Sequence, residues 1–306
     1  MPRQPLRAGR RRESLRAVTT AVQSILQSIA QMSAYPFMVN AFEAGTIVAI
    51  VAGLVGWFMV LRRQSFAGHA LAVVGFPGAA GAALLGIGAA WGYFTFCLAA
   101  ALVIALLPPS RGAGRADESA VTGTVQALAL ACGFLFVSLY HGFLNGIDAL
   151  LFGSFLGISQ GQVLALLGVG VGALAVLALI GRPLLFASVD PEVAVAGNVP
   201  VWALSVAFLL LLGVAVAEAS QITGTLLVFA LLVAPAAIAQ TLTARPSVGL
   251  ALSPLIALGV TWGGLTLAYY WHYPIGFFVT SLAFGAYVIA RVATSGLGRR
   301  RSRGAR

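Results

Sequence analysis

Few side chains in this chain can do chemistry. The 306 residues contain eight carboxylates, three histidines and two cysteines, and all 18 basic residues are arginine. Without lysine, the chain cannot form a P-loop phosphate grip, a kinase-type ATP contact or a Schiff base to a cofactor. If its work consumes ATP, a partner must hydrolyse it. No cofactor is predicted, and the three histidines stand too far apart in sequence to suggest a catalytic cluster.

Several ionisable residues stand in or beside long apolar runs. A charge at the centre of a membrane costs roughly 3 kcal/mol or more, so such residues are functional by default. Glu43 and Glu218 lie at the ends of predicted spans, where interfacial anchoring is the favoured interpretation. If the extracellular side needs carboxylates to receive a cation or dock a binding protein, these two are the candidates. The other members of the group are His141, Asp148 and His272.

The elements that must position these residues are membrane helices. The chain is 60% apolar and 8% charged, with a mean hydropathy of +0.97. A helix needs roughly 20 apolar residues to cross the hydrocarbon. The predicted fold is an all-α, polytopic transmembrane bundle of eight to nine spans in the lipid bilayer of the cell membrane. The expected spans are 41–61, 70–88, 91–107, 121–140, 162–181, 201–218, 222–242, 248–270 and 275–292.

The arginines predict the orientation. The net charge of +10 could suggest nucleic acid, but the arginines gather at both termini and in short connections, as the positive-inside rule describes. No nucleic-acid partner is therefore expected. Arg62, Arg63, Arg111, Arg115, Arg182, Arg245 and the C-terminal arginines fit one cytoplasmic side through nine spans. That count leaves the arginine-rich start on the other side, so either one span does not cross or the first segment does not belong.

The chain divides into three regions. Residues 1–34 form an arginine-rich segment with an amphipathic stripe, which predicts an interfacial helix. Alternatively, this segment is an upstream extension and translation starts at Met32. Residues 35–292 form the transmembrane domain, and residues 293–306 form a basic cytoplasmic tail.

Prolines inside predicted spans suggest bends. Pro77 and Gly78 predict a helix break that opens toward a cavity, and the alternative is a tightly packed helix. Pro235 removes one backbone donor and should kink its span, which would supply a bend point in a moving pore.

Three segments carry a more specific signature. They are Val60–Leu71 continuing to Gly78, Leu151–Ser159, and Val189–Pro200 followed by the stretches from Gly224 to Val228 and from Ala234 to Ala237. In order and separation they resemble the membrane permeases of zinc and manganese ABC importers, from Tyr35 to about Arg291. The resemblance implies a pore made with a second copy of the permease, a cytoplasmic ABC ATPase dimer and an extracellular or periplasmic metal-binding protein. The cargo would be a divalent metal ion, zinc, manganese or iron, and the chain itself would not be an enzyme.

The third segment looks like the coupling helix that such permeases lay into a groove of the ATPase. Pro191 suits the first turn of a helix, Asp190 can cap it, and Glu192 complements the N-terminal dipole. Ala194 belongs to the same segment. The alternative is a merely solvated turn. Gly197 and Asn198 replace the Leu-Gly common in the family, which affects the fine contact.

The metal path departs from the family pattern. Such permeases place an Asp after the paired arginines and a His four residues later, so that both lie on one helix face and ligate an ion. Here His69 occupies the Asp position and Val73 the His position. An imidazole suits Zn²⁺, whereas Val73 is no ligand. His69 is therefore either a metal ligand or a hydrogen-bond donor within the bundle.

Two other functions remain as alternatives. An ion-driven secondary transporter would show inverted repeats and carboxylates in the middle of the membrane. The sequence shows no convincing repeat, and its carboxylates sit at span ends. A membrane enzyme would need a clustered catalytic set on one helix, which the scattered histidines do not provide.

Overall fold

The computed structural model describes residues 34–107, 115–140, 153, 157–271 and 273–303. The interfacial helix predicted before Ser33 lies outside the described residues, as do His141, Asp148 and His272. Within the described ranges the chain is helical and contains no strand. The helices are α2 (Pro36–Leu61), α3 (Ser65–Leu84), α4 (Ala89–Leu106), α5 (Arg115–Leu139), α7 (Gln160–Val189), α8 (Pro191–Ala196), α9 (Val201–Thr223), α10 (Thr225–Leu242), α11 (Pro246–Tyr270) and α12 (Ile275–Arg303).

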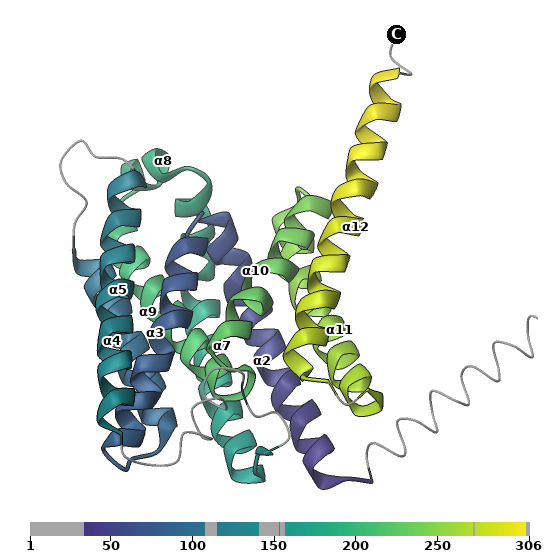
Figure 1. Cartoon of the computed structure of the whole chain (residues 1–306). Helices are drawn as coiled ribbons and strands as arrows, with labels where there is room; N and C mark the ends of the chain where they lie inside the picture. Colours follow the sequence, from purple (N-terminus) through teal and green to yellow (C-terminus); the bar gives the residue numbers. More distant parts are fainter. Residues whose placement is uncertain (1–33, 108–114, 141–152, 154–156, 272, 304–306) are drawn as a thin grey trace, which may run out of the picture.

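Membrane-sized helices make up the bundle. Among the described helices, eight are long and apolar enough to cross a membrane, and the described apolar part of α10, Leu227–Leu242, is shorter. The predicted bundle of eight to nine spans is thereby confirmed. Helix α12 continues through residue 293 to Arg303, and its last part projects beyond the other helices (Figure 1).

The long helices alternate in direction, so the connections gather at two ends of the bundle (Figure 1). One end carries α8, the end of α12 and the arginine-bearing connections at Arg62, Arg63, Arg115 and Arg245, and we call it the arginine end. The other end carries the start of α2 and the turn between α9 and α10. The arginines of the described connections thus lie on one side, as the sequence predicts.

Helix α2 lies at the centre of the bundle and packs against α7, α9, α10 and α11. Two glycines permit the closest approaches. A Cβ atom at Gly53 would lie 2.5 Å from Pro254 Cα of α11, and one at Gly56 would overlap the backbone carbonyl oxygen of Leu232 in α10. Lipid tails are as apolar as leucine, so membrane helices associate through such close packing.

Glycines also join α3 to α4. Gly78 of α3 faces Gly92 of α4, and a Cβ atom on either would overlap the carbonyl oxygen of the other. The helix break predicted at Pro77 and Gly78 is wrong, because α3 is continuous from Ser65 to Leu84 with Pro77 inside it. The alternative interpretation, a tightly packed helix, describes this segment. Pro235 likewise lies inside α10 without ending it.

Replacing Gly78 by alanine should destabilise the bundle. The new methyl group would meet backbone atoms of Gly92, which cannot rotate away, and overpacking of this kind costs about 1–3 kcal/mol. The matched control is Gly172→Ala in α7, where a Cβ atom meets nothing within 4 Å. Thermal unfolding of the purified proteins in one detergent should show a lower midpoint for Gly78→Ala than for the wild type, and an unchanged or higher midpoint for Gly172→Ala. Equal midpoints for the two variants would contradict the close contact.

Candidate coupling surface and ion path

The short helix α8 lies at the arginine end, between α7 and α9 (Figure 1). Its start follows from its sequence. Asp190 is the N-cap, and its side-chain oxygen Oδ1 accepts a hydrogen bond from the backbone N–H of Val193 at 3.1 Å. Pro191 fills the first helical position and Glu192 stands in the first turn. Cap, proline and acidic first turn all agree with the local structure expected from the sequence.

Helix α8 and the end of α7 carry exposed apolar side chains. Ala194 is fully buried and anchors the helix, whereas Val193 and Val195 are 53% and 62% exposed. Val189, at the end of α7, is 67% exposed beside them. Single apolar residues on a surface need no explanation, whereas larger exposed apolar patches are typical of interaction sites. We call Val189, Val193 and Val195 the α8 valine patch.

Arg62 connects the helices on both sides of α8. At the end of α2, its guanidinium donates to Ser205 Oγ of α9 at 2.7 Å and to Ser188 Oγ of α7 at 3.2 Å. The same group lies over the Phe208 ring, 5.4 Å from its centroid. Ser188 and Ser205 flank α8 in the sequence. Arg62 thus joins α7 and α9 to the turn that leads into α3.

His69 lies in the second turn of α3 and is half-buried. Its ring packs edge-on against Phe229 of α10, with 4.9 Å between the ring centroids. The Nδ1 atom is buried and has no hydrogen-bond partner among the described residues. An imidazole nitrogen without a partner inside a membrane bundle is available to a ligand. The alternative role, a hydrogen bond within the bundle, has no support at this atom.

The described residues do not assemble a complete metal site in one chain. No group of three or more His, Cys, Asp or Glu side chains comes together among the described residues. Val73, one turn beyond His69 on α3, is half-buried and offers no ligand atom. Any ion held at His69 would therefore need ligands from a second copy of the chain, from backbone carbonyl groups or from water.

The two carboxylates singled out in the sequence differ in their surroundings. Glu43 is exposed near the start of α2, at the end opposite the arginines, and Gln160 Nε2 donates to its Oε2 at 3.5 Å. Glu218 is fully buried, and within the described part of the chain neither carboxyl oxygen has a hydrogen-bond partner. The predicted span end at 218 is wrong, since α9 continues to Thr223. Glu218 is therefore not available at the surface in this structure.

Glu218 faces the inside of the bundle. A Cβ atom placed on Gly170 of α7 would lie 2.9 Å from Glu218 Oε1, and it would also meet Ile47 and Val51 of α2. Among the described side chains, Glu218 is the only acidic one that is fully buried. Sequence reasoning placed this residue too near the surface because hydropathy alone cannot locate the end of a helix that continues through polar residues.

Two signature segments meet at the turn between α9 and α10. Gly224 has φ +71°, and Gly153 has φ +80°. A Cβ atom on Gly153 would overlap the backbone of Ile222 and Thr223. The positive φ favours glycine at both positions, and at Gly153 the lack of space requires it as well. The sequence marks both glycines as part of a signature, but their contact appears only in the structure.

A family model described as the ABC 3 transport family matches residues 34–294. The manganese transport system membrane protein MntC of Halalkalibacterium halodurans is 30% identical over 230 residues, 74% of this chain and 77% of that protein. The chelated iron transport system membrane protein YfeC of Yersinia pestis is 31% identical over 245 residues, 80% of each chain. Among solved structures, PsaBC from Streptococcus pneumoniae in complex with Fab is similar with a TM-score of 0.76 and 27% identity. This similarity covers 87% of this chain and 95% of that one.

These similarities extend over nearly all of the described helices, and the resemblance to an ABC importer permease that the signature segments indicated is confirmed. The alternative of an ion-driven secondary transporter is set aside. This chain belongs to the ABC 3 transport family and is a multi-pass membrane permease of an ABC transporter.

Proposed function

We propose that this permease imports a divalent transition-metal ion, manganese, iron or zinc, with energy supplied by a cytoplasmic ABC ATPase dimer. The observation that carries the proposal is the family match over residues 34–294, together with relatives described as manganese and chelated iron transport proteins. The arginine end faces the cytoplasm, and an extracellular or periplasmic binding protein delivers the ion to the opposite end. A second copy of the permease completes the pore.

The proposed contact with the ATPase is α8. Three features support this assignment: a capped helix start, a buried anchor at Ala194 and the exposed α8 valine patch. Apolar side chains on the outer face give a partner surface to bury, and Arg62 joins the helices on both sides of α8 to the turn that leads into α3. Closure of the ATPases would then move α7, α9 and the start of α3 together.

The proposed ion path uses His69 and Glu218. Imidazole nitrogen and carboxylate oxygen are both ligands for divalent transition metals. His69 presents a buried nitrogen and Glu218 a buried carboxyl group, and neither has a hydrogen-bond partner in the ranges that the structure describes. Burying polar groups without hydrogen bonds is costly, which favours a functional reason for retaining both. Glu43, exposed at the opposite end beside Gln160, is proposed to attract the incoming cation.

The role of α8 can be tested by separating its fold from its surface. Val195→Asp should abolish copurification with the co-expressed ATPase, because it places a charge in the apolar contact and leaves the buried side of the helix unchanged. Val248→Asp, at an exposed valine near the start of α11 at the same end, is the control and should leave copurification intact. Equal copurification for both variants would remove α8 from the interface.

The helix cap provides a second test of coupling. Asp190→Ala loses the hydrogen bond to Val193 N–H, which costs about 1 kcal/mol of helix stability, whereas asparagine caps equally well. In reconstituted vesicles, Asp190→Ala combined with Glu192→Ala should hydrolyse ATP without matched metal uptake. Asp190→Asn alone should keep the two coupled. Uptake that stays matched to hydrolysis in the double variant would contradict a coupling role for this segment.

His69 can be tested with two substitutions. His69→Ala should lower uptake of ⁵⁴Mn or ⁶⁵Zn by about tenfold or more, the loss expected when a metal ligand is removed. His69→Phe keeps an aromatic ring against Phe229 but has no nitrogen, and it should lower uptake equally. Uptake retained by the phenylalanine variant would mean that only packing matters at this position. Val73→His would add a second imidazole one turn away and should lower the ion concentration that half-saturates uptake.

Glu218→Gln should reduce uptake while the protein remains folded, because the amide has nearly the same volume but removes the carboxylate ligand. Thermal unfolding in detergent verifies that the fold survives. Wild-type uptake at limiting metal concentration in Glu218→Gln would remove this residue from the proposed path.

A further inference from the structure

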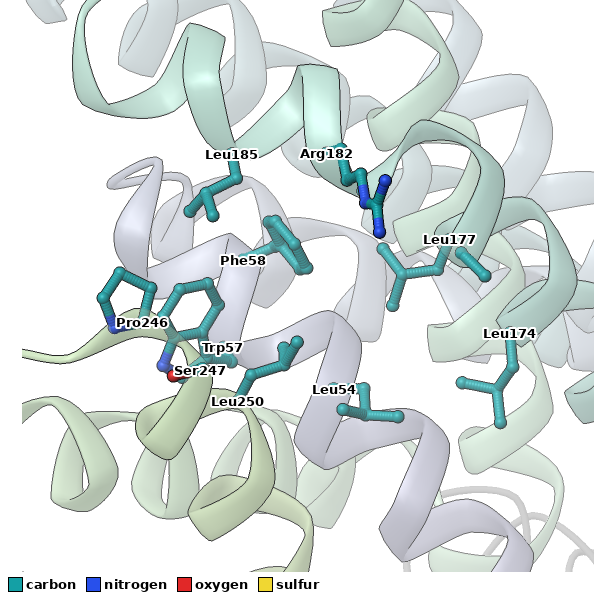
Figure 2. A pocket seen from close by; sticks show the side chains of 12 residues that line it. Leu54, Trp57, Phe58, Leu174, Leu177, Arg182, Leu185, Pro246, Ser247 and Leu250 are labelled. Atoms are coloured by element: carbon teal, nitrogen blue, oxygen red, sulfur yellow. The ribbon is translucent and has the colours of Figure 1, made fainter.

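An apolar groove runs along the outside of α7 in the half of the bundle near the arginine end. It has a volume of about 410 Å³ and lies between α2, α7 and α11. Figure 2 shows Leu185 and Pro246 toward one end, Leu54 and Leu174 toward the other, and Trp57 and Leu250 between them. This volume lies within the range typical of ligand sites, about 300–1,000 Å³.

Arg182 is the charged residue among those that line this groove. Its side chain is exposed and makes no hydrogen bond or ion pair within the described part of the chain. Arg182 lies seven residues before Val189, the last residue of α7, so its Cα is about 10 Å below the arginine end of that helix. Figure 2 shows its guanidinium directed toward Leu177, and turning this long side chain toward the arginine end would bring it to the level of lipid headgroups.

The shape of the groove matches a chain-like apolar molecule. Its lining residues on α7 extend from Leu174 to Leu185, a distance of about 16 Å along the helix. The groove is lined by aliphatic and aromatic side chains. The two polar side chains in its lining are Ser247 and Arg182. A transported cation finds no ligand set here and would be repelled by the guanidinium. The groove is thus distinct from the proposed ion path, and its assignment does not depend on which ion is carried.

We propose that this groove binds one anionic phospholipid of the leaflet at the arginine end, with the phosphate on Arg182 and an acyl chain along α7. Charge complementarity favours this occupant over a second copy of the chain. The exposed carboxylates among the described side chains, Glu43, Asp190 and Glu192, lie at the two ends of the bundle and not at the depth of Arg182. Anionic headgroups are abundant in a cytoplasmic leaflet, and basic pockets between membrane helices bind them.

The test measures lipid retention by the full chain. The permease is reconstituted in vesicles of phosphatidylcholine with phosphatidylglycerol, extracted in mild detergent and analysed by native mass spectrometry. One phosphatidylglycerol per chain should be retained in preference to phosphatidylcholine. Arg182→Gln should lower this retention by about fivefold, and Arg182→Lys, which keeps the charge, should not. Arg291→Gln, at an exposed arginine of α12 outside the groove, is the matched control and should retain the lipid.

A second variant tests the groove separately from its charge. Gly181→Leu places a side chain into the groove, where a Cβ atom has ordinary contact with Phe58 at 3.9 Å, and it should also lower phosphatidylglycerol retention. Equal retention by Arg182→Gln and wild type, or equal retention of both lipids by wild type, would overturn the proposal. Benzoyl-phenylalanine at Leu185 should cross-link to phospholipid on illumination. A cross-linked permease dimer in its place would show that a second copy covers the groove and would also overturn it.

Discussion

Close approach of helix backbones at glycine is the constraint on which this bundle depends. In a bilayer, an apolar side chain gains little free energy by exchanging lipid contacts for helix contacts, because lipid tails are equally apolar. Helix association therefore relies on contact area and on small residues. Helix α2 meets α11 at Gly53 and α10 at Gly56, and these contacts leave no space for a Cβ atom. The same helix ends at Arg62, whose guanidinium binds α7 and α9. The glycines thus fix the helix from which the arginine end is organised.

This arrangement explains why the few polar groups can be placed so deep. Gly170 on α7 leaves room for the carboxyl group of Glu218, and Gly75 on α3 faces the buried hydroxyl of Ser220. A methyl group at either glycine would come within 3.3 Å of these oxygens. Small residues in this bundle therefore serve two purposes: they bring backbones together, and they make space for polar side chains that have no hydrogen-bond partner within the described residues.

Local features were predictable from the sequence because their causes are local. The cap at Asp190, the proline at 191 and the acidic first turn lie within three residues, and the structure has them as expected. The spans followed from hydropathy, and the side on which the described arginines gather followed from their spacing. The break predicted at Pro77 is absent from α3, and the close packing of this segment against α4, where Gly78 meets Gly92 fourteen positions away, appears only in the structure. The depth of Glu218 likewise depends on α7, a separate helix.

The few charged residues suggest how the proposed ATPase surface is linked to the proposed ion path. A lysine-free permease has no phosphate grip of its own, so the energy for its proposed transport must arrive through a surface, and α8 offers an apolar one at the arginine end. The ion must pass a bundle in which His69 stands on α3, directly after the turn that Arg62 holds. Because Arg62 binds α7 and α9, the two neighbours of α8, a movement that α8 shares with these helices would shift the start of α3 as long as the hydrogen bonds to Ser188 and Ser205 hold. This connection gives the proposed coupling a physical route of a few residues between the ATPase surface and the proposed ion path.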